Sequence, residues 1–270
     1  MADATASNAA LLRPIAEGAR RRYAALALVA LALTLVVVAA SAYLRLVQEG
    51  VRCEVATDCV AQRQAIAEAR GTFFARSAHR LAASGVSLAV LAMVVIAWRQ
   101  RGPQALPRRW ATLALTLVVG LALLGIATPG STLPAIKLGN LLGGYALLAC
   151  LAAAHASLRP RSAWRGQRLA VLALALGFVQ AALGALIPAE SSLHLLHRID
   201  GIVLAAVVTL LIVRLWPEPD FLASALTMTL AVGVAAGLAA ALAPWTLGPT
   251  MLHGVLAAVL LGLLARAAVR

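Results

Sequence analysis

Two histidine–arginine pairs stand where long apolar segments begin. The first pair is His79–Arg80 and the second is His197–Arg198, with His194 three residues before the second histidine. A further histidine, His253, lies near the start of the last apolar segment. A neutral imidazole is a good axial ligand for haem iron, and a guanidinium pairs well with a haem propionate. Because ionisable groups that recur at one membrane depth usually mark function, this pattern favours a haem site over hydrogen-bonded structural histidines.

The composition shows what kind of chain must position these groups. Of 270 residues, 62% are hydrophobic and only 12% are charged, while the net charge is +13. Such a chain has too few polar residues to cover a water-soluble globule, so it predicts a polytopic membrane protein surrounded by lipid. The arginines fall mostly in short connectors, as the positive-inside rule requires. We therefore expect no nucleic-acid partner.

Eight apolar segments are long enough to cross a bilayer at a rise of about 1.5 Å per residue. They cover residues 23–46, 79–98, 110–128, 133–157, 169–187, 193–216, 222–242 and 250–269. The basic connectors place both termini in the cytoplasm. The sequence thus predicts an all-α integral protein of a bacterial-type inner membrane, with eight transmembrane helices.

The two histidine–arginine pairs also indicate an internal duplication. Aligning them superimposes segment 79–98 on 193–216 and segment 133–157 on 250–269, which sets Asn140 against His253. The fold expected is two tandem four-helix bundles. Their parts are a cytoplasmic tail 1–22, a first bundle 23–157 with an outer loop 47–77, a cytoplasmic linker 158–168 and a second bundle 169–270.

The duplication predicts different haem sites in the two bundles. In the second, His197 and His253 face each other and clamp a porphyrin between apolar helices. In the first, His79 faces Asn140, which is a poor ligand for haem iron, so a haem there is five-coordinate, weakly held or absent. His155 is a further fifteen residues along, about 22 Å of helix, and is expected to be an interfacial polar residue.

Two of the three cysteines, Cys53 and Cys59, lie in the polar outer loop. In an oxidising compartment they can close a small disulfide ring, whereas two free thiols or a metal site are the alternatives. Cys150 stands within an apolar segment and is expected to be a small core residue.

Taken together, these residues resemble the haem A synthase family over about residues 29–264. The stretch Ser41–Leu46, followed by Cys53 and Cys59, is similar to the family's Gly-Ala-Tyr-(Leu/Val)-Arg-Leu and its loop with two cysteines. Residues 180–186 are similar to the family's fifth-span Gln-x-x-Leu-Gly-Ala motif. The histidines at 79, 197 and 253 are similar to three of the family's four haem-site histidines.

The resemblance implies an oxidoreductase that converts the C8 methyl of haem O into the formyl of haem A. It implies a haem b held by His197 and His253, and a substrate haem at His79 and Asn140. Arg45 and Arg80 are then expected beside the propionates of haem O. The partners it implies are haem O synthase and assembly proteins of the terminal oxidase.

Four departures from the family pattern fall on the first bundle or the outer rim. Asn140 replaces the fourth histidine, Arg76 replaces a glutamate, and residues 54–57 replace a Pro-Asp-Trp-Pro core. The outer loop of the second half is also shortened to a few residues, 188–192. A second hypothesis is therefore a haem-binding membrane protein without synthase activity, such as a cytochrome b-like protein, a haem carrier or an oxidase assembly factor. A third is a secondary transporter, for which obvious broken helices and intramembrane acids other than Asp200 are lacking.

Overall fold

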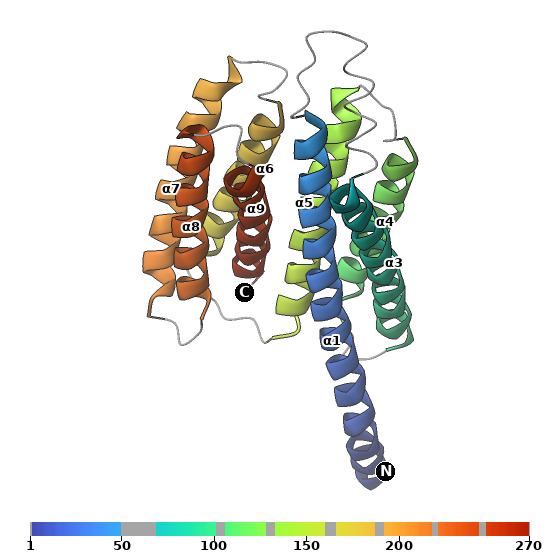
Figure 1. The fold of residues 1–270 in the computed structure, drawn as a ribbon. Helices are drawn as coiled ribbons and strands as arrows, with labels where there is room; N and C mark the ends of the chain where they lie inside the picture. Colours follow the sequence, from blue (N-terminus) through green and yellow to red (C-terminus); the bar gives the residue numbers. More distant parts are fainter. Residues whose placement is uncertain are drawn as a thin grey trace.

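The computed structural model describes residues 2–49, 69–100, 106–127, 133–159, 166–186, 192–217, 221–242 and 247–269. This part of the chain forms eight helices, labelled as in Figure 1: α1 (Ala2–Glu49), α3 (Arg70–Arg99), α4 (Arg108–Ala127), α5 (Pro134–Ala156), α6 (Gln167–Leu186), α7 (Leu193–Leu215), α8 (Leu222–Leu242) and α9 (Leu247–Ala268). All eight are long and apolar enough to cross a membrane. The prediction of an all-α membrane protein with eight transmembrane helices is confirmed.

Helices α1 and α3 begin well before the apolar pattern predicts. The first runs from Ala2 through the segment expected as a tail, and Figure 1 shows it projecting beyond the other helices. That segment is rich in alanine, the best helix former, so helical hydrogen bonding continues outside the apolar region. Helix α3 begins at Arg70, nine residues before His79. His79 therefore lies more than two turns inside its helix rather than at its start.

The helices pack as two groups of four, which lie side by side in Figure 1. In the first group α1 packs on α3, α3 on α4, α4 on α5 and α5 on α1. In the second group α6, α7, α8 and α9 pack in the same cyclic order. Helices α3 and α5 are thus diagonal in one group, as α7 and α9 are in the other. In each predicted pair, His79 with Asn140 and His197 with His253, the two residues lie on diagonal helices. Their side chains can therefore meet only across the interior of the bundle.

The two groups share an interface formed mainly by α1, α5 and α9, with a smaller contribution from α6. It contains a cluster of buried side chains at mid-depth, Val38, Tyr145, Leu148, Ala258 and Leu261. The Tyr145 hydroxyl donates a hydrogen bond of 2.8 Å to the carbonyl of Gly254, the residue after His253. The interface therefore ties the first group to the helix that carries a predicted haem ligand.

The two ends of the protein differ in packing. We name them the basic end, which carries Arg22, Arg99, Arg108, Arg159 and Arg168, and the histidine end, which carries His79, His197 and His253. The largest fully buried side chains lie toward the basic end, among them Tyr23, Met93, Leu151, Leu211, Leu215, Leu222, Leu226 and Leu264. Leucine and isoleucine side chains exposed on the outer helix faces, such as Leu81 and Ile126, are those expected to meet lipid.

Candidate functional site

The interior of the histidine end is loosely packed. Beyond the mid-depth cluster, its buried residues are small, namely Ala40, Ala42, Thr72, Ala82 and Ala236. Consecutive residues of its helices are partly exposed, as at 138–144 of α5, 181–186 of α6 and 253–257 of α9. A helix face closed against its neighbours would instead show buried residues at every third or fourth position. Among the described residues, this end therefore has fewer large buried side chains filling its interior than the basic end has.

His197 of α7 and His253 of α9 face each other across this loosely packed interior. Their ring centres are 6.5 Å apart and their planes are inclined by 77°. Metal–nitrogen bonds of about 2 Å, with about 1 Å more from each nitrogen to its ring centre, set two imidazoles on one iron about 6 Å apart. The observed separation is close to that value. The two rings can thus act as a pair on one ion.

The hydrogen bonding of His253 leaves one ring nitrogen suited to a metal. Its Nδ1 lies 2.9 Å from the carbonyl oxygen of Gly233 on α8. A carbonyl only accepts, so Nδ1 carries the proton and Nε2 keeps its lone pair. A backbone carbonyl that fixes the tautomer in this way is the usual outer partner of a metal-ligating histidine.

His197 is held less completely. Its Nε2 lies 3.3 Å from the amide nitrogen of Gln180 on α6. Within the described part of the chain, its Nδ1 is buried without a hydrogen-bond partner, as are Gln180 Oε1 and Asp200 Oδ2. Unpartnered buried polar atoms cost free energy, so their presence here is typical of a site that another group completes. Ligation through Nε2 requires the Gln180 amide to turn away, and ligation through Nδ1 requires the ring to flip.

Three glycines make space for these polar side chains. A Cβ atom on Gly184 of α6 would lie 3.0 Å from His197 Cε1, and one on Gly237 of α8 would lie 2.8 Å from His253 Cε1 and Nδ1. A Cβ atom on Gly201 of α7 would lie 2.9 Å from the Gln180 amide nitrogen. All four helices of the second group thus contribute either an imidazole or the space that an imidazole or its amide partner occupies.

Sequence reasoning did not assign these supporting residues. Gln180 and Gly184 belong to the motif that resembles the fifth span of haem A synthases, but the motif alone gives neither of them a contact. Gly233 and Gly237 are one turn apart in an Ala/Leu-rich helix. That spacing is the sequence feature from which their role beside His253 could have been predicted.

Two imidazole ligands, those of His197 and His253, limit which kind of metal group the site can bind. Sites for a bare transition-metal ion use three or four protein ligands. An iron that already has four porphyrin nitrogens needs only axial ligands, for which two imidazoles suffice. The donor set and the unpartnered polar atoms therefore fit a haem.

The first group presents a different arrangement. His79 Nδ1 lies 3.0 Å from Ser41 Oγ of the neighbouring α1, and within the described part of the chain His79 makes no hydrogen bond with Asn140. The other histidine of this group, His155, lies at the basic end. The glycines also differ, because a Cβ atom on Gly85 or Gly143 would meet a leucine side chain rather than an imidazole.

The predicted arginines lie at the histidine end in different surroundings. Arg80 and Arg198 are exposed, whereas Arg45 is partly buried and lies close enough to Tyr145 to act on it electrostatically. His194 is exposed.

The predicted disulfide partners, Cys53 and Cys59, fall outside the described residues. Cys150 is buried, as expected of a small core residue, and its thiol donates a hydrogen bond of 3.4 Å to the Trp110 carbonyl.

Comparison of the chain with protein-family models, with curated proteins and with solved structures finds no match. Inferences about function therefore start from the geometry of the histidine end.

Proposed function

We propose that the chain is a haem A synthase-like membrane oxidoreductase that oxidises the C8 methyl of haem O to the formyl of haem A. In this proposal His197 and His253 hold a haem b in the second group, and His79 binds the substrate haem in the first. The observation that supports it most is the facing pair of imidazoles, 6.5 Å apart in a loosely packed interior. The histidine end then faces the outer side of a bacterial-type inner membrane, with both termini in the cytoplasm.

The side chains of the second group have definable tasks in this function. The Gly233 carbonyl fixes the proton of His253 on Nδ1 and aims Nε2 inward. Gly184 and Gly237 keep the space beside each ring open. A haem b held there supplies a one-electron centre. The surrounding apolar helices exclude water from it.

The oxidation of haem O also requires an electron acceptor from outside the chain. A methyl group and one water give a formyl group with release of four protons and four electrons. An external oxidant must therefore accept those electrons, and a one-electron centre in the second group can only relay them. Arg45 and Arg80 are proposed to pair with the propionates of haem O, and Arg198 with those of haem b.

A second function, haem binding without synthase activity, is favoured by the first group. There His79 lies against Ser41, and a leucine side chain fills the space beside Gly85. On this alternative the protein serves as a cytochrome b-like protein, a haem carrier or an oxidase assembly factor, and only the second group carries haem.

Expression with and without a haem O synthase tests the first function against the second. We expect haem A in the extracted pigments only when the haem O synthase is present. Extraction of haem b alone under both conditions would refute the synthase proposal and support the second function.

Ligand variants test the haem b site itself. His197→Ala and His253→Ala should each abolish the low-spin optical spectrum of bis-imidazole haem, because each removes one axial ligand. His194→Ala is the matched control, since this exposed histidine lies on the same helix one turn from His197. Retention of the spectrum in both ligand variants, or its loss in the control alone, would contradict the assignment.

A further inference from the structure

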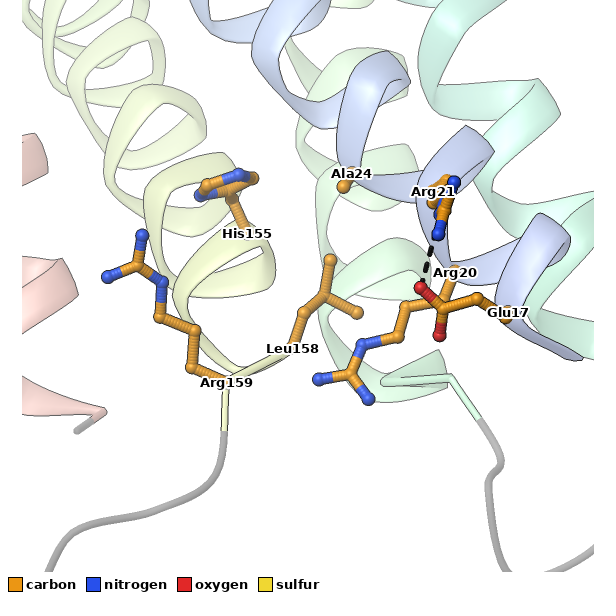
Figure 2. Close-up of a pocket in the computed structure, with 7 residues that line it drawn as sticks. All are labelled: Glu17, Arg20, Arg21, Ala24, His155, Leu158 and Arg159. Carbon is orange, nitrogen blue, oxygen red and sulfur yellow. Dashed lines mark hydrogen bonds and ion pairs between the residues drawn. The ribbon is translucent and has the colours of Figure 1, made fainter.

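A cavity at the basic end lies away from the histidines discussed above. It has a volume of about 240 Å³ and lies between α1 and the end of α5. Its lining residues are labelled in Figure 2, with Arg20 and Arg21 on α1, His155 in the last turn of α5, and Arg159 just beyond that helix. At about 30 Å³ for a water molecule in the liquid, the cavity is large enough for a polar headgroup.

The cavity carries an excess of positive charge. Among the described residues, Glu17 is the only acidic one that lines it, and its carboxylate pairs with Arg21 of the next turn at 3.2 Å. Arg20 and Arg159 then remain as positive charges that no other described carboxylate of the cavity neutralises. Arg266 of α9 also lies close enough to act electrostatically on His155. Two arginines, Arg159 and Arg266, thus act electrostatically on His155, and Arg20 lines the same cavity from α1.

The positive-inside rule explains basic connectors but not this grouping. Arg20 and Arg159 are far apart in the sequence, and packing of α1 on α5 brings them to one cavity. Both side chains are exposed, so their guanidinium groups are free to turn toward a ligand in the cavity. A phosphate offers oxygen acceptors to more than one guanidinium.

The rest of the cavity is apolar and leads toward the membrane. Ala24 and Leu158 line it beside the arginines. On α1, Leu28 lies one turn deeper than Ala24 on the same face, and it is 51% exposed to the surroundings. The surface thus changes from basic at the arginines to apolar along α1. A ligand with a charged head and an apolar tail matches this change better than a small soluble anion does.

We propose that this cavity binds the phosphate of an anionic phospholipid, with Arg20 and Arg159 as its cationic partners and an acyl chain along α1. Basic pockets between transmembrane helices on the cytoplasmic side are known to take such headgroups. The proposal does not depend on haem binding at the opposite end.

The test uses the full-length protein, purified in detergent, delipidated and titrated with dioleoylphosphatidylglycerol while native mass spectrometry counts bound lipid. Each basic side chain near an anionic lipid contributes enough that Arg20→Gln with Arg159→Gln should weaken binding roughly thirtyfold. The matched control is Arg99→Gln with Arg168→Gln, which removes the same charge from exposed positions at the same end. The control should bind phosphatidylglycerol as the parent does.

A lysine variant, a neutral lipid and competition with inorganic phosphate distinguish lipid binding from unfolding and from binding of a soluble anion. Replacing both cavity arginines by lysine should restore most of the binding, which also shows that loss in the glutamine variant is not unfolding. Phosphatidylcholine should bind at least tenfold more weakly than phosphatidylglycerol. Equal binding of the two lipids, equal loss in the control, or full displacement of phosphatidylglycerol by millimolar inorganic phosphate would each overturn the proposal, the last in favour of a soluble anion.

Discussion

Gly237 provides a test of the second group that leaves both proposed ligands in place. A Cβ atom at this position would lie 2.8 Å from two atoms of the His253 ring, against 3.4 Å for ordinary contact. The Gly237→Ala variant therefore requires a displacement of about 0.6 Å. A shift of that size along the 2.9 Å bond from Nδ1 to the Gly233 carbonyl takes it out of hydrogen-bonding range.

The expected loss of haem follows from that displaced bond. Removing the outer partner of a metal-ligating histidine typically lowers metal affinity about 10- to 100-fold. Alanine is also a better helix former than glycine by about 1 kcal/mol, so helix α8 itself should not be weakened. We therefore expect Gly237→Ala to insert and fold, yet to bind haem at least tenfold more weakly than the parent.

The assay is titration of the haem-free protein with haemin, followed at the Soret band, with the haem-to-protein ratio checked by pyridine haemochrome. Gly233→Ala is the matched control on the same helix, because its added Cβ would meet Leu256 at an ordinary 3.8 Å. The Gly233→Ala variant keeps the backbone carbonyl that accepts the hydrogen bond from His253 Nδ1. Unchanged haem affinity in Gly237→Ala, or an equal loss in Gly233→Ala, would refute the assignment of this space to the His253 ring.

Three further predictions concern other parts of the protein. Asn140→His should raise the haem-to-protein ratio or convert a high-spin signal to low-spin, because it offers a second imidazole opposite His79; an unchanged spectrum would argue against the duplication at α5. Tyr145→Phe removes the hydrogen bond to Gly254 and should lower the free energy of unfolding by about 1 kcal/mol, seen as a lower thermal midpoint with haem retained; an unchanged midpoint would contradict a stabilising role. Cys53 and Cys59 should be linked by a disulfide worth about 2 kcal/mol, and mass measurement of protein isolated without reductant should show the pair two hydrogens lighter than the free thiols.

The membrane architecture could be predicted because hydropathy and charge act on whole segments. Runs of about twenty apolar residues must cross the bilayer as helices, and arginines mark the connectors. The pairing of α7 with α9 across a bundle followed from the repeated histidine–arginine pair. The starts of α1 and α3 did not follow, because helical hydrogen bonding continues beyond the apolar region into Ala2 and Arg70.

The supporting residues of the site were harder to predict for a physical reason. Helices α6 and α8 have no single apolar face, so hydropathy does not fix their rotation about their own axes. Without that rotation, Gly184 and Gly237 cannot be assigned to the interior. The contact between His79 and Ser41 depends in the same way on how α1 and α3 are rotated against each other.

The distribution of packing links folding to the proposed cofactor. Large buried side chains toward the basic end, such as Tyr23 and Leu215, can hold the helices together without a ligand, while the histidine end contributes little apolar burial. A haem bound there stabilises the folded state in proportion to its affinity and concentration. The second group, whose glycines face imidazoles, should gain more from haem than the first, where Gly85 and Gly143 face leucines. The two groups therefore differ in the side chains packed against their glycines as well as in their predicted haem ligands.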